Sequence, residues 1–108
     1  MIDEHLQSAE SVVKRAESIS ADKKVELLGL LSRLKSAIGD VSQTHAEDAQ
    51  SVARLTETSA REATLKRPNQ LEKALHALKQ SVEKFEASHP DLVIRVNDFA
   101  TLLAEMGI

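Results

Sequence analysis

The stretch that decides the fold lies at residues 71–85 and reads LEKALHALKQSVEKF. Its large apolar residues stand three or four positions apart, at Leu71, Leu75, Leu78, Val82 and Phe85. A helix with 3.6 residues per turn brings such positions onto one face. These two heptads therefore predict an amphipathic helix over residues 70–87 that packs its apolar face against other helices.

The same spacing continues on both sides of this stretch. Toward the C-terminus it predicts a helix over residues 90–106, through Leu92, Val96, Phe99, Leu103 and Met106. Toward the N-terminus it predicts helices over residues 2–19, 21–39 and 42–66. We therefore expect an all-α protein of four or five amphipathic helices, arranged in antiparallel hairpins as a helical bundle or a coiled-coil-like dimer.

The helices expected over 21–39 and 42–66 differ in the size of their apolar residues. The first has a broad stripe that includes Leu27, Leu31 and Leu34, whereas the second has a seam of alanines. Alanine buries little surface, and burial stabilises by roughly 25 cal/mol per Å². We therefore expect the alanine helix to be weakly packed and the most mobile one. Whether the chain breaks between the two at Gly39-Asp40 stays open.

Two i, i+4 ion pairs are expected on the alanine helix. Glu57 precedes Arg61 and Glu62 precedes Lys66, which is the favourable orientation on a helix. After them, Pro68 is expected to end the helix, because proline disfavours helix at the residue before it.

Length and composition limit the possible functions. A chain of 108 residues suits one domain over residues 1–108, and its only aromatic residues are Phe85 and Phe99. Fourteen basic and seventeen acidic residues are interspersed, so the net charge of −3 provides no basic patch for nucleic acid. The chain has no cysteine and no long apolar run. These features predict a cytoplasmic protein that binds neither nucleic acid nor membrane.

A family resemblance rests on the C-terminal part of the chain. Residues 85–92 read FEASHPDL, and residues 106–108 read MGI. This pattern resembles a bacterial family of short helical proteins of unknown function. The resemblance implies a bacterial origin and a signature of packing residues, to which we add the core positions of the last helix: Phe85, Glu86, His89, Pro90, Leu92, Phe99, Met106, Gly107 and Ile108. It assigns no activity to any of them.

One constellation invites a chemical interpretation. Glu86 and His89 have the i, i+3 spacing with which a carboxylate and an imidazole bind one metal in helical bundles. A dinuclear site needs this pair twice, and it occurs once. The favoured interpretation is a corner in which Ser88 or His89 caps the last helix while Phe85 and Leu92 pack across the turn.

The remaining histidine pairs have a structural interpretation. His45 with Asp48 and Glu72 with His76 stand at helical spacings but off the apolar stripes. We expect them to face solvent. No catalytic, cofactor or metal site is therefore predicted, and the expected function is a non-enzymatic structural or protein-interaction module that forms homodimers. The alternative is a metal-binding bundle that uses Glu86 and His89.

Overall fold

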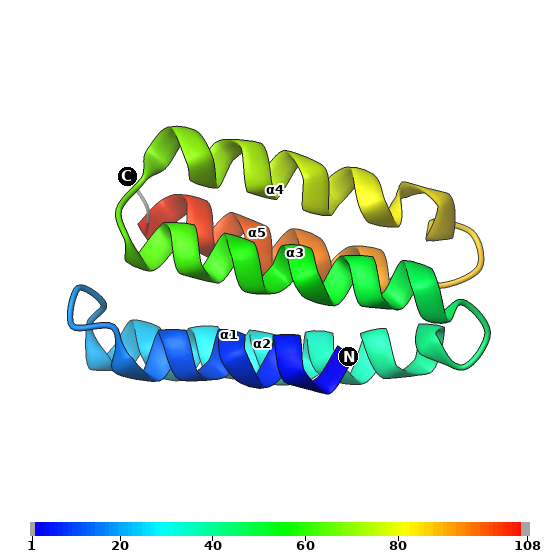
Figure 1. Ribbon diagram of the computed structural model, residues 1–108, viewed down its shortest axis with the longest axis horizontal. Coiled ribbons are helices and arrows are strands. Elements are labelled where there is room, and N and C mark those ends of the chain that lie inside the picture. Colours follow the sequence, from blue (N-terminus) through cyan, green and yellow to red (C-terminus); the bar gives the residue numbers. More distant parts are fainter. Residues whose placement is uncertain (1, 107–108) are drawn as a thin grey trace.

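The computed structural model describes residues 2–106 and forms five α-helices and one 3-10 turn over that range. Their bounds are α1 (Ile2–Arg15), α2 (Ala21–Ser42), α3 (Ala46–Thr64), α4 (Pro68–Val82), η1 (Glu83–Phe85) and α5 (Pro90–Met106). Short connections make each helix run opposite to the one before it (Figure 1). The prediction of an all-α bundle is confirmed.

The helices form two layers. In one layer α3 lies between α1 and α4, and in the other α2 packs against α5. The bundle measures 37 × 23 × 20 Å, with the helices aligned along its long axis (Figure 1). Within residues 2–106, no helix is long and apolar enough to span a lipid bilayer.

A single apolar core fills the space between the layers. From α2 the core takes Leu27, Leu31, Leu34, Ile38 and Val41, which are fully buried or nearly so. Phe99 of α5 is also fully buried, and α1 contributes Leu6 and Val13. Each buried side chain of this size stabilises the fold by about 1.5–3 kcal/mol relative to an exposed one. Three large apolar side chains are prominently exposed in the described chain, and they lie at separate places: Val25, Leu65 and Ile94. The apolar faces of the helices are thus buried largely within one chain.

Several helix boundaries differ from those expected. The first helix ends at Arg15, four residues early, and the second is continuous through Gly39-Asp40 to Ser42. A Cβ at Gly39 would meet nothing within 4 Å, so this glycine neither breaks the helix nor permits a close approach. Helix α2 begins at Ala21, as the sequence predicts, and the Ser20 hydroxyl caps it by accepting a 3.3 Å hydrogen bond from the Lys23 amide.

The corner between α3 and α4 is tighter than expected. Lys66 has a φ of 57°, and its amide donates to the Ala63 carbonyl while the Arg67 amide donates to the Glu62 carbonyl. This is the hydrogen-bond pattern of a Schellman helix end. Because proline fits the first position of a helix, α4 begins at Pro68 rather than at residue 70. It ends at Val82, and η1 completes the expected helix up to Phe85.

The expectation of a weakly packed alanine helix is wrong. The central helix α3 contacts all four other α-helices. Its buried residues are Ala49, Val52, Ala53, Thr56, Ser59, Ala60 and Ala63. Small side chains bury little area each, but they let neighbouring helices approach from several sides at once. The position of α3 in the bundle, rather than the size of its residues, determines how much it is packed.

Candidate functional site

The corner before α5 places the residues of the family-like pattern. Phe85 and Leu92 are buried on either side of the turn, and Pro90 is the exposed first residue of α5. The predicted side-chain cap is wrong, because the hydrogen bond here joins the Leu92 amide to the His89 carbonyl. Met106 is half-buried at the end of α5. The other two signature residues, Gly107 and Ile108, lie outside the described residues.

His89 meets a different partner from the one the sequence suggested. Glu86 is exposed, whereas the His89 ring lies 5.6 Å from the Phe85 ring and 6.2 Å from the His45 ring. His45 in turn lies 5.2 Å from Phe85, and all three contacts are edge-on. The three rings therefore join the α2–α3 loop to the corner before α5, a contact that separations along the chain could not reveal.

This ring cluster lacks the ligands for a metal centre. In the described part of the chain, no three His, Asp or Glu side chains are arranged to hold a metal ion. His45 is exposed and Asp48 is partly exposed, in line with the expectation that they face solvent, but the two do not pair with each other. The Nδ1 atom of His45 forms a 2.8 Å hydrogen bond with the Thr44 hydroxyl. Asp48 forms a 2.9 Å ion pair with Lys84.

A polar network joins α1 to α3. The Glu57 carboxylate lies 2.7 Å from His5 Nδ1 and 2.9 Å from the Arg61 guanidinium, which also donates to the Ser8 hydroxyl at 3.0 Å. Burial raises the pKa of Glu57, but hydrogen bonds with Ser8, His5 and Arg61 outweigh burial and lower the pKa below its usual 4.5. The network links α1 to α3 through side chains of both helices.

One of the two predicted ion pairs forms. Glu57 pairs with Arg61, whereas Glu62 lies 3.7 Å from Arg67 rather than beside Lys66. The Schellman turn carries Lys66 away, and its ammonium donates to the Met106 carbonyl at 3.3 Å. This cation stands at the negative end of the α5 dipole, where it is stabilising.

A hollow on the surface lies beside α4. It has a volume of about 860 Å³, and Leu71 and Leu75 of α4 and Ala104 of α5 form its apolar floor. We call it the α4 groove. Its remaining lining residues are polar or lie at the start of the helix: Pro68, Asn69, Glu72, Lys73, His76 and Lys79.

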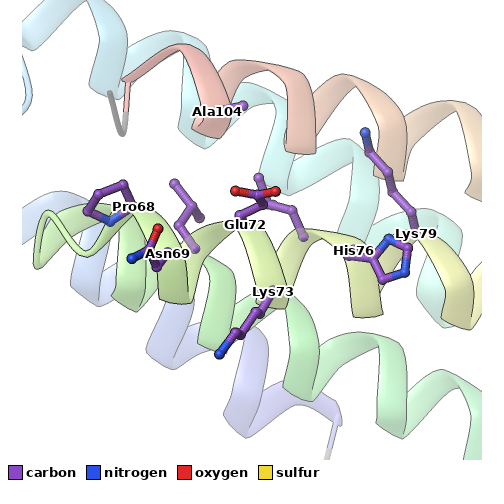
Figure 2. Close-up of a pocket in the computed structure, with 9 residues that line it drawn as sticks. Pro68, Asn69, Glu72, Lys73, His76, Lys79 and Ala104 are labelled. Carbon is purple, nitrogen blue, oxygen red and sulfur yellow. The ribbon is translucent and has the colours of Figure 1, made fainter.

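The charged residues of the α4 groove are arranged along the helix rather than clustered. Glu72 and Lys79 extend on the side of α4 that faces α5, whereas Lys73 points away from α5 (Figure 2). Neither Glu72 nor Lys79 has an ion-pair partner within residues 2–106. The groove therefore has an apolar lining with Glu72 and Lys79, seven residues apart, on the side that faces α5, while Lys73, which is also unpaired in this range, points the other way.

The position of this groove does not follow from apolar periodicity. Leu71 and Leu75 repeat with the core stripe and predict burial, yet α4 lies at the edge of its layer. Both leucines are buried, with 4% and 7% of their surface exposed, and the groove forms beside them where α4 has no neighbouring helix on one flank. Which helix is at the edge depends on the tertiary arrangement, and the sequence pattern is similar for helices in the middle.

Comparison with known proteins assigns the chain to a family, but the description of that family names no activity. Neither the curated proteins nor the solved structures include a match to this chain. A family model described as a domain of unknown function matches residues 27–108, which contain the alanine helix and the groove but not α1. Since this match covers most of the chain, the protein belongs to the family named Domain of unknown function (DUF4404).

Proposed function

We propose that this chain is a non-enzymatic protein-interaction module of a bacterial cytoplasm and that it binds its partner through the α4 groove. The observation that carries the proposal is the groove itself, a hollow lined by Leu71, Leu75 and Ala104 with charged side chains at its edge; the two leucines are largely buried, and the hollow opens beside them. Binding surfaces on proteins commonly combine an apolar centre with a polar rim.

The titratable pairs elsewhere support a structural role. His5 with Glu57 joins α1 to α3, and Lys84 with Asp48 joins η1 to α3. These pairs link elements that are far apart in the sequence, so their polar chemistry serves the fold. The metal-binding alternative at Glu86 and His89 receives no such support, because Glu86 is exposed and no group of three or more His, Asp or Glu side chains within residues 2–106 could hold a metal ion.

Site-specific photo-crosslinking in the native cells tests the proposal. A photoreactive residue at Asn69 stands in the groove, and one at Ser36, exposed on α2, is the matched control. We expect a protein adduct from position 69 and none of the same mass from position 36. The variant Ala104→Arg fills the groove from α5 and should abolish the adduct. Identical adducts from both positions, or an adduct that survives Ala104→Arg, would contradict the proposal.

A further inference from the structure

We infer that the occupant of the α4 groove is a second copy of this chain, docked with its own α4 antiparallel to the first. This inference rests on the proposed function and names the partner of the same site. It follows from the order of charges along α4, which is complementary to itself when the helix is reversed.

The charge order gives the register of the two helices. Glu72 and Lys79 are seven residues, or two helical turns, apart, so both project from the same face about 10.5 Å from each other. A two-fold axis that passes α4 between Leu75 and His76 brings Glu72 of one copy opposite Lys79 of the other, and the reverse. A two-fold interface requires this reciprocity, in which residue i meets residue j and j meets i.

The surroundings of these two charges support docking there. Both side chains are exposed and lack an ion-pair partner within residues 2–106, so docking would break no intramolecular pair in that range. The apolar floor at Leu71, Leu75 and Ala104 can take the methylene stem of a partner's lysine, which covers apolar surface while its ammonium stays at the rim. The two ion pairs lie at the exposed rim of the groove, so salt screens them and the dimer dissociates further at high salt.

Reversal of the charges, one at a time and then together, tests the register. Sedimentation equilibrium of the wild type over a wide concentration range should give a monomer–dimer equilibrium. In the dimer, Glu72→Lys turns both ion pairs into Lys–Lys repulsion, and Lys79→Glu turns both into Glu–Glu repulsion. Each should raise the Kd about tenfold or more. The double variant Glu72→Lys/Lys79→Glu restores both pairs in the opposite sense and should return the Kd to near the wild-type value.

The matched control is Glu17→Lys, a reversal at an exposed glutamate in the α1–α2 loop, which should leave the Kd unchanged. Circular dichroism checks that each variant is folded, since every reversed residue is exposed. A wild type that is monomeric at all concentrations overturns the inference. So does a dimer that ignores the single reversals, or a double variant that remains as weak as the single ones. A monomer that still crosslinks to another protein from position 69 refutes this inference alone and leaves the proposed function standing.

Discussion

Helices α2 and α3 cross the same core but use opposite kinds of side chain. The buried residues of α2 are Leu27, Leu31, Leu34, Ile38 and Val41, whereas α3 buries four alanines together with Val52, Thr56 and Ser59. The large residues of α2 fill space between the layers. The small residues of α3 leave room for the four helices that contact it.

This difference teaches that the two helices have opposite tolerances. A position on α2 is sensitive to loss of volume, because the core around a large side chain relaxes only partly into the cavity. A position on α3 is sensitive to gain of volume, because neighbours on several sides cannot all withdraw. The area buried per residue is small on α3 and predicts a weakly packed helix. It does not predict how sensitive α3 is to added side-chain volume.

The largest expected effect tests the α2 half of the comparison. Leu31 is fully buried, and Leu31→Ala should lower the free energy of unfolding by about 2–5 kcal/mol. Urea denaturation followed by circular dichroism measures this change. The control on the same helix is Val25→Ala, because Val25 is 73% exposed and its truncation should change stability by less than about 0.5 kcal/mol. Equal losses at both positions would show that α2 is not a core helix.

The α3 half is tested by the addition of volume. Ala60 is fully buried, so Ala60→Leu should destabilise by about 1–3 kcal/mol through displaced neighbours. The control is Ala46→Leu, the same change at the exposed start of α3, which should be close to neutral. If Ala60→Leu instead stabilised the protein, α3 would have unfilled space around it. The alanine helix would then be weakly packed, as its sequence alone predicts.

These two tests also separate what the sequence could predict from what it could not. Apolar spacing predicts four or five helices and most of the core, since residues such as Leu31 and Leu78 lie on the apolar face of an amphipathic helix. Spacing does not say how many neighbours a helix has. The alanines of α3 predict a weak seam because their spacing defines only one face of the helix, whereas in the bundle α3 contacts four helices.

The candidate site was harder to predict for the same reason. Glu86 and His89 drew attention because they are close in sequence, yet His89 packs with His45, forty-four residues earlier. The free charges Glu72 and Lys79 were visible in the sequence as ordinary surface residues. Their significance depends on α4 lying at the edge of its layer, which is a property of the assembled fold.

A smaller effect concerns the one buried hydroxyl of α3 that lacks a partner in the described chain. Ser59 is fully buried, and its Oγ makes no hydrogen bond, whereas the buried Thr56 hydroxyl donates to the Val52 carbonyl at 2.8 Å. Burial of an unpaired polar group is costly, so Ser59→Ala should raise the free energy of unfolding by about 1 kcal/mol.

Part of that gain comes from the higher helix propensity of alanine, which a serine-to-alanine change at an exposed helical position measures separately. Ser36→Ala, at an exposed position of α2, gives the propensity gain alone, about 0.5 kcal/mol. Chemical denaturation of both variants separates the two contributions. A gain at Ser59 no larger than the gain at Ser36 would mean that the buried hydroxyl has a hydrogen-bond partner. It would also mean that α3 is less tightly packed there than its contacts with four helices indicate.

The smallest effect tests how α3 holds α1. Hydrogen bonds with Ser8, His5 and Arg61 lower the pKa of Glu57 below 4.5 in the folded state, despite burial. A carboxyl whose pKa is lowered by folding stabilises the protein above its unfolded pKa, and that contribution is lost as the pH falls through the folded value. Wild type should therefore exceed Glu57→Gln in stability near neutral pH, by less than about 1 kcal/mol, because the group is partly exposed.

The pH dependence of this difference is more informative than its size. Urea denaturation of both proteins at a series of pH values should show the gap closing as the pH is lowered past 4.5, because protonation removes the charge that glutamine lacks at every pH. Glu17→Gln, in the exposed α1–α2 loop, should show no comparable closure. A gap that stays constant in acid would mean that Glu57 acts through shape rather than charge, and that α1 is held on α3 by its apolar face alone.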